Sequence, residues 1–258
     1  MRIFLTIALS ALLAASPVAH ALPDELEVRL GEINKPGQLG FDVMANYTVS
    51  GPRKSADDGL RSSFHLLQIS PTLSYGMTED TQVGFQLFSS LGAHGEARVD
   101  GGRIEFLALP VRPEDDDDDG LFFGGLLGVG HLPATLSNNH LDAEIKMILG
   151  YRAGRWTFAT NPDVGVKISG KGSAEPDFSV KFKVAYRVDH RYSIGVEHYG
   201  DLGRLRHIDP PNQHSQQTFA VVDLKAEGME FNVGIGRGLN DFSERWAVKT
   251  IVSFPFGK

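Results

Sequence analysis

The sequence predicts an all-β protein that folds as a transmembrane, antiparallel, up-and-down β-barrel of about 12 strands. Three observations predict this fold. An apolar leader opens the chain, apolar and polar side chains alternate in segments of about ten to thirteen residues from Leu39 onward, and short connections alternate with longer ones. No segment is continuously apolar over the roughly 20 residues that a membrane-spanning helix needs.

The leader has the features of a secretory signal peptide. Arg2 precedes an apolar stretch from Ile3 to Ala15. The small residues after this stretch are typical of a cleavage site and predict cleavage after Ala21. We therefore expect residues 1–21 to be removed during export.

After the leader we expect a periplasmic N-terminal segment over residues 22–38 and the barrel over residues 39–258. Segment 22–38 is rich in acids. It either tucks into the lumen of the barrel or forms a flexible periplasmic tail, and the sequence favours neither.

Composition narrows the partners and the chemistry. The chain has 32 acidic and 25 basic residues, a formal net charge of −7, which argues against nucleic acid as a partner. Cysteine is absent, which rules out disulfides and thiolate metal sites. We expect no cofactor and no bound metal.

The alternation is clearest in three consecutive segments at 141–152, 155–168 and 178–187. In the middle segment Trp156 and Phe158 share the apolar face, because side chains two residues apart point the same way in a strand. The nine other expected strands cover residues 39–50, 62–77, 81–92, 102–112, 121–133, 192–202, 216–227, 229–239 and 245–256.

The connections alternate in length, as in outer-membrane barrels, where short periplasmic turns face longer external loops. An even number of strands places both termini on the periplasmic side. One long turn, Pro113–Gly120, is expected among the short ones. The other short connections lie at 78–80, 153–154, 189–191 and near Gly228, and the longer ones at 51–61, 93–101, 169–176 and 203–215.

Alternation alone does not separate a membrane barrel from a soluble one, whose apolar face forms its core. Aromatic residues near strand ends, such as Tyr47, Tyr75 and Tyr192, favour lipid outside, because they would form the interfacial girdles. We therefore expect outer-membrane lipids around the barrel. The residues assigned to the lipid-facing wall are Trp156, Phe158, Val180, Phe182, Val184, Trp246, Phe254 and Phe256.

The opposite faces carry most of the charges and are expected to line the lumen. Neighbouring segments 155–168 and 178–187 present five basic residues with only Asp163 among them, which predicts a basic wall. Opposite charges either pair and plug the lumen, or leave a wetted channel that favours anions. The assigned pore-lining residues are Arg155, Asp163, Lys167, Lys181, Lys183, Arg187, Glu197, Asp201, Asp223 and Lys249, and the other inward charges are Asp42, Arg103, Glu105, Asp142, Glu144, Lys146, Arg152, Lys225 and Arg245.

Other polar groups give weaker signals. Asp115–Asp119 lacks the ligand spacing of a calcium loop and is better explained as a solvated turn. His198 is expected to face outward without a convincing serine partner or a positioning acid or amide, so we predict no enzyme. The loop histidines His140, His207 and His214 lack the spacing of a metal site with a supporting acid.

Three stretches in the C-terminal third, Gly195–Gly203, Gly234–Leu239 and Arg245–Phe256, resemble an uncharacterised proteobacterial outer-membrane family sometimes labelled as a phenol meta-pathway transporter. The ending at Phe256 also resembles the C-terminal signal that the outer-membrane assembly machinery recognises, although Gly257 and Lys258 follow it. The resemblance implies a barrel in the outer membrane of a Gram-negative bacterium.

We predict a porin-like outer-membrane channel for the passive passage of small anionic or aromatic solutes. The alternative is a non-conducting barrel with a structural or surface-interaction role, and a lipid-modifying enzyme is a weaker third possibility. Twelve strands lie between the eight of a filled barrel and the sixteen of a wide channel. We therefore expect a narrow, partly obstructed pore.

Overall fold

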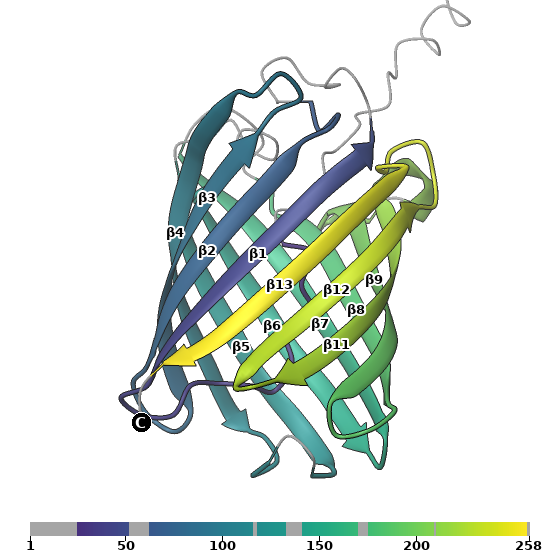
Figure 1. Ribbon diagram of the computed structural model, residues 1–258. Coiled ribbons are helices and arrows are strands. Elements are labelled where there is room, and N and C mark those ends of the chain that lie inside the picture. The colour runs from purple at the N-terminus through teal and green to yellow at the C-terminus, as the bar shows by residue number, and fades with distance from the viewer. Residues whose placement is uncertain are drawn as a thin grey trace, which may run out of the picture.

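The computed structural model describes residues 25–51, 62–115, 118–132, 141–169, 175–208 and 210–256. The chain forms one closed antiparallel barrel of 12 strands, with one extra short strand (Figure 1). Strand β1 (Leu39–Ser50) pairs with the last strand, β13 (Trp246–Phe256), and this pairing closes the barrel. The fold class predicted from the sequence is confirmed.

The other strands follow one another around the wall in chain order. They are β2 (Leu67–Gly76), β3 (Thr81–Leu91), β4 (Ala97–Val111), β5 (Gly120–His131), β6 (Leu141–Ala153), β7 (Trp156–Ser169), β8 (Asp177–Arg187), β9 (Tyr192–Arg204), β11 (Gln216–Ala226) and β12 (Met229–Gly238). Strand β10 (His207–Ile208) extends β9 as a short hairpin, and a 3₁₀ turn, η2 (Pro211–Gln213), follows it.

The largest differences from the predicted strand boundaries are at the starts of two strands. Strand β2 begins at Leu67 rather than at residue 62, and β4 begins at Ala97 rather than at residue 102. A bulge in the β3–β4 pairing, between Phe88 and Ser89, lets the ladder continue into this polar stretch. The expected loop 93–101 is therefore shortened to residues 92–96.

The two ends of the barrel differ in their connections. At the short-turn end the tightest turns place Gly154 (φ 58°) and Gly228 (φ 79°) in the left-handed region that glycine tolerates best. The start of β1 and the end of β13 also lie at this end (Figure 1). The short-turn end carries 77–80, 112–119, 154–155, 188–191 and 227–228, and the long-loop end carries 51–66, 92–96, 132–140, 170–176, 205–215 and 239–245.

The turn between β8 and β9 shows how these short connections are stabilised. The Asp189 carboxylate accepts hydrogen bonds from the backbone amides of Arg191 at 2.7 Å and Tyr192 at 3.0 Å. These amides hold the pKa of Asp189 below its ordinary value. The carboxylate therefore stays ionised and keeps its two bonds at neutral pH.

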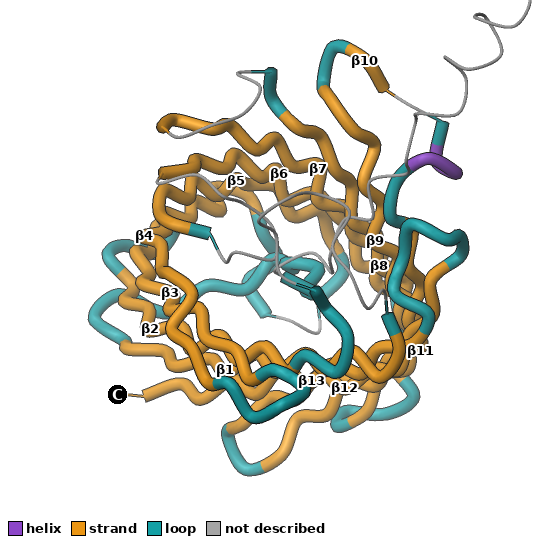
Figure 2. The backbone as a smooth tube through the Cα atoms, turned by 90° about the horizontal axis from the view of Figure 1, so that it is seen from above, coloured by secondary structure: helices purple, strands orange, loops and turns teal. Residues whose placement is uncertain are grey.

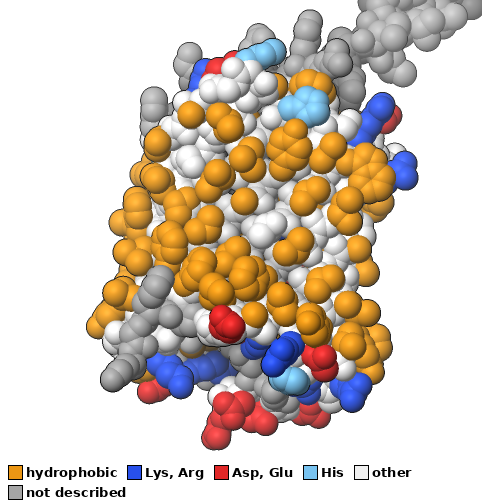
Figure 3. Space-filling model, viewed as in Figure 1, with side chains coloured by type: hydrophobic (Ala, Val, Ile, Leu, Met, Phe, Trp, Pro, Cys, Tyr) orange, Lys and Arg blue, Asp and Glu red, His pale blue; other side chains and the backbone are white. Residues whose placement is uncertain are grey.

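Apolar side chains cover the outside of the wall. Figure 3 shows them over the middle of one face, with charged side chains gathered towards the two ends of the barrel. Leu73, Phe85 and Ile145 are exposed on the outer surface, whereas Lys146 and Lys249 on the inner face are 0 % exposed. This arrangement is the reverse of a soluble barrel, in which the apolar face is buried.

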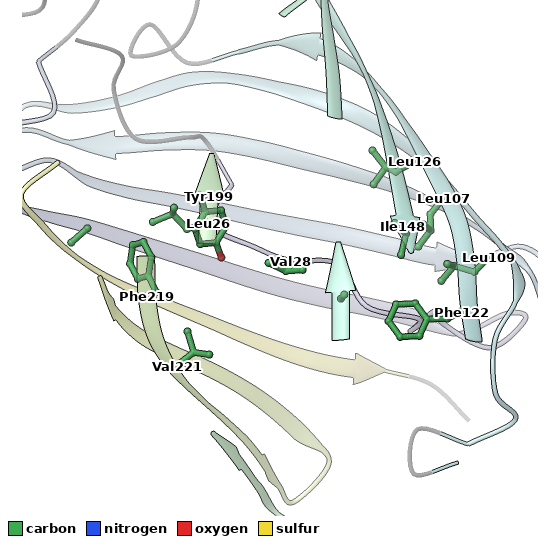
Figure 4. Close-up of a cluster of buried hydrophobic side chains, with 12 residues drawn as sticks. Leu26, Val28, Leu107, Leu109, Phe122, Leu126, Ile148, Tyr199, Phe219 and Val221 are labelled. Carbon is green, nitrogen blue, oxygen red and sulfur yellow. The ribbon is translucent and has the colours of Figure 1, made fainter. Parts of the chain in front are cut away.

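Residues 25–38 run as an extended chain inside the barrel (Figure 2) and leave it at the short-turn end (Figure 1). Leu26 is 0 % exposed and Val28 is 6 % exposed, and both belong to the apolar cluster of Figure 4. The backbone amide of Gly37 donates to Gly76 O at 2.9 Å, which ties the exit of the segment to β2. The structure thus decides between the two expected positions of the N-terminal segment, because from Glu25 onward it occupies the lumen.

Candidate functional site

The lumen holds the N-terminal segment partly through apolar contacts. Phe122 and Leu126 on β5 point inward and share one buried cluster with Val28, and Leu30 and Ile33 pack against that cluster. Gly31 lies so close to Phe122 that a Cβ there would meet the phenylalanine Cβ at 2.7 Å. The segment therefore fits closely against this wall.

Sequence reasoning missed this inner apolar surface. A signal was present, because β5 is apolar on both faces: Leu121 and Leu127 are exposed outside, while Phe122 and Leu126 are buried inside. An inner face lined only by water would not favour a phenylalanine. Apolar residues on both faces of one strand indicate that protein covers the inner face.

The first polar cluster surrounds the Glu25 carboxylate with three cations. Oε1 accepts a short hydrogen bond from the Arg103 guanidinium, and Oε2 lies 2.5 Å from Lys146 Nζ and 3.5 Å from Lys181 Nζ. The three cations come from β4, β6 and β8, and each is nearly inaccessible to solvent. We call Glu25, Arg103, Lys146 and Lys181 the Glu25 cluster.

Each cation of the Glu25 cluster also has a carboxylate partner on the wall. Arg103 Nε donates to Glu105 at 2.6 Å, and Glu144 lies 2.5 Å from Arg103 and 2.6 Å from Lys146. Asp163 lies 3.9 Å from Lys146 and 3.8 Å from Lys181. These pairs compensate charges that would be costly to bury alone.

A second polar cluster lies around Glu197 on β9. Lys249 Nζ donates to the Glu197 carboxylate, to Tyr199 Oη at 2.9 Å and to the backbone oxygen of Leu26 at 2.8 Å. Lys183 Nζ lies 3.1 Å from Glu197 and 2.8 Å from Asp223. We call Lys183, Glu197, Tyr199, Asp223 and Lys249 the Glu197 cluster.

Farther down, towards the short-turn end, the segment exchanges polar contacts with the wall. The Asn161 side chain accepts from the Arg29 amide at 2.6 Å and donates to the Arg29 carbonyl at 3.0 Å. Glu32 lies 3.6 Å from Arg152, and Asn34 Nδ2 donates to Ser74 Oγ at 2.7 Å. The segment is therefore bound along its whole described length.

A cavity of about 180 Å³ remains beside the segment towards the short-turn end. Its lining includes Glu27 and Glu32 from the segment and Arg152, Arg187 and Asn232 from the wall. A water molecule needs roughly 10–15 Å³ of such space and two or more polar partners. The cavity can therefore hold several waters.

The expectation of an unbalanced basic wall is wrong. Carboxylates from other elements reach Lys181 and Lys183, namely Glu25 of the segment, Glu197 of β9 and Asp223 of β11. Glu197 and Asp223 were assigned to the inner face, and their pairing with Lys183 agrees with the expected alternative of paired charges. Glu25 was not expected beside Lys181, because no strand pattern places the N-terminal segment in the lumen.

The remaining residues assigned to the pore lie nearer the two ends of the barrel. Arg155 lies in the turn before β7 and is exposed, and Arg245 likewise precedes β13, so neither belongs to the inner face of a strand. Lys167 lies 3.7 Å from Asp177, and Arg187 donates to Gly154 O at 2.9 Å. Asp201, on β9 near the long-loop end, lies 3.6 Å from His214 Nδ1.

The residues assigned to the lipid-facing wall mostly lie on the outer surface. Phe182 is 48 % exposed and Val184 is 40 % exposed, whereas Lys181 and Lys183 are 5 % and 4 % exposed. Trp156, Phe158 and Trp246 are also exposed, Val180 and Phe254 are half-buried, and the side chain of Phe256 lies outside the described part of the structure.

His198 faces outward, but its surroundings differ from those expected. Thr218 Oγ1 lies 3.0 Å from Nδ1 and Gln216 Oε1 lies 3.1 Å from Nε2, both from neighbouring β11. An amide partner, which sequence reasoning did not find, is therefore present. Gln216 Nε2 also donates to Asp201 O at 2.7 Å, so this group ties β9 to β11 on the outer wall.

The acidic turn is described only in part, since residues 116 and 117 lie outside the described residues. Asp119 Oδ1 accepts from the Gly154 amide at 2.6 Å, and the Asp118 amide donates to Asp115 O at 3.1 Å. These bonds stabilise neighbouring turns. His140 also lies outside the described residues, and His207 is exposed in β10.

Comparison with solved structures gives the same fold. The COG4313 outer membrane channel from Pseudomonas putida F1 superposes with a TM-score of 0.57 at 12 % identity, over 90 % of this chain and 100 % of that one. The KdgM porin in complex with disordered oligogalacturonate gives 0.53 at 9 % identity, over 84 % and 99 %. The NanC porin gives 0.52 at 10 % identity, over 84 % and 100 %.

No family model matches the sequence, and no curated protein matches it. At these low identities the structural likeness shows a shared barrel architecture. The function has to be argued from the wall and the lumen.

Proposed function

We propose that this protein is an outer-membrane channel that lets small charged solutes cross passively through the barrel. The observation that carries the proposal is the combination of an apolar outer wall with a lumen lined by charged side chains. Such a wall is suited to lipid, and such an inner face is suited to hydrated or charged solutes. Exported chains with this architecture are typical of Gram-negative outer membranes.

The N-terminal segment makes the proposed channel a narrow one. It fills the middle of the lumen, and the cavity of about 180 Å³ beside it opens at the short-turn end. We therefore expect small conductance with the segment in place, and larger openings when it moves.

Three proteins with similar structures support this function: one is described as an outer membrane channel and two as porins, one of the porins in complex with oligogalacturonate. The resemblance of the C-terminal third to the phenol meta-pathway family suggests aromatic solutes as a second class. The ion pairs of the lumen favour charged solutes over neutral aromatic ones. Outer-membrane lipids and the assembly machinery are the proposed partners of the wall and of the C-terminal strand.

The test is a conductance measurement on refolded mature protein in planar bilayers. Folding is checked independently, since a closed barrel migrates differently on a gel before and after boiling. Discrete steps that are absent with boiled protein at the same concentration would support the channel. Correctly folded protein without conductance would favour the non-conducting structural barrel.

A further inference from the structure

The N-terminal segment places a carboxylate at one point in the lumen where three cations converge. Glu25 is 3 % exposed and contacts Arg103, Lys146 and Lys181 from three different strands. Both of its oxygens are used, Oε1 by the guanidinium and Oε2 by the two ammonium groups. This is a complete binding arrangement for a carboxylate, and the protein fills it with its own chain.

We propose that the Arg103, Lys146 and Lys181 groups form a binding site for the carboxylate of a small anionic solute, and that Glu25 occupies this site until the solute displaces it. The inference rests on the proposed channel function and names its solute class. The occupant is a carboxylate rather than a halide, because the donors are arranged for two separate oxygens, one facing the Arg103 guanidinium and the other facing the ammonium groups of Lys146 and Lys181.

The wall keeps this site assembled when Glu25 leaves. Arg103 remains held by Glu105 and Glu144, and Lys146 by Glu144. A site with fixed donors need not be reorganised for each solute molecule.

The same wall carboxylates also limit how tightly a solute is held. They compensate much of the positive charge, so a bound carboxylate is retained by directed hydrogen bonds more than by a large excess of charge. A channel needs such a site, which a solute both enters and leaves.

The segment is a competitor that a solute can displace. Glu25 is tethered, and a short flexible tether corresponds to an effective concentration in the millimolar range. Leu26 and Arg29 add further contacts. Displacement therefore requires free carboxylate at a higher concentration than the tether alone would imply.

The first test is rescue of Glu25→Ala in the full mature chain. The substitution leaves three cations without the Glu25 carboxylate, so the temperature at which the folded gel band disappears should fall. Sodium acetate should restore at least half of that loss, and sodium chloride at equal ionic strength should not. Glu27→Ala is the matched control, since Glu27 pairs with Arg29 at 2.9 Å and, among the described residues, forms no ion pair with the three cations. Acetate should not restore the temperature that Glu27→Ala loses.

The second test works even if Glu25→Ala fails to assemble. The chain has no cysteine, so Leu26→Cys provides a single thiol beside Glu25, at a position that is 0 % exposed. Acetate at about 0.5 M, well above the effective concentration of a short tether, should raise its rate of reaction with a maleimide several-fold over chloride.

Equal effects of acetate and chloride in both tests would overturn the carboxylate site. Neither readout requires current through the protein. Rescue and displacement without conductance would support the carboxylate site and refute the channel. Conductance without rescue or displacement would support the channel and refute the carboxylate site.

Discussion

Lys249→Met tests whether the Glu197 cluster stabilises the barrel. Lys249 is fully buried, and its ammonium donates to Glu197, Tyr199 and the Leu26 carbonyl. Removing one partner of a buried ion pair costs about 3–5 kcal/mol. Because Lys183 remains 3.1 Å from Glu197, we expect the lower end, a loss of about 3 kcal/mol in the free energy of unfolding.

The assay is urea unfolding of the protein in liposomes, followed by the shift between folded and unfolded gel bands. Lys225→Met is the matched control, because Lys225 pairs with Glu230 at 3.1 Å but is about half exposed. An exposed pair contributes roughly 0–1 kcal/mol. The double variant Lys249→Met/Glu197→Gln should lose about 1–3 kcal/mol less than the sum of the two single losses, because the two sites are coupled.

Equal losses in the free energy of unfolding for Lys249→Met and Lys225→Met would refute this reasoning, because burial would then make no difference to how much an ion pair stabilises the barrel. A double variant whose loss is the simple sum of the single losses would also refute it. In either case the contacts of Lys249 would be incidental to stability.

Three further predictions concern the wall and the leader. Phe182→Arg should reduce the amount of assembled protein, because an arginine that faces the middle of the bilayer costs about 2–4 kcal/mol. Phe182→Leu should be tolerated. Band-shift assays of membrane fractions would measure both. Gly150→Ala should cost about 1–3 kcal/mol in the same urea assay, because a Cβ there would lie 2.0 Å from the Phe122 ring, whereas Gly165→Ala meets nothing within 4 Å and should be neutral. Mass spectrometry of the exported protein should give a chain that begins directly after Ala21; an intact leader would contradict the signal peptide.

Much of the barrel could be predicted because a strand has a two-residue period. Alternation assigns Phe182 to one face and Lys183 to the other without knowledge of any neighbour. The closed sheet follows from an exported chain in which nearly every segment alternates in this way. Errors in the strand assignment were confined to boundaries, as at Arg155 and Arg245, where a turn residue continues the alternation by chance.

The sequence by itself therefore determined the twelve strands of the barrel, their order and the face on which most side chains within them lie. Only the tertiary structure decided what the lumen contains. Glu25 meets Lys146, 121 residues away, and Leu26 meets Lys249, 223 residues away. Periodicity is a local property, and it says that a side chain points inward without saying what it meets there. That partner depends on how the closed barrel curves and on where a separate segment enters it.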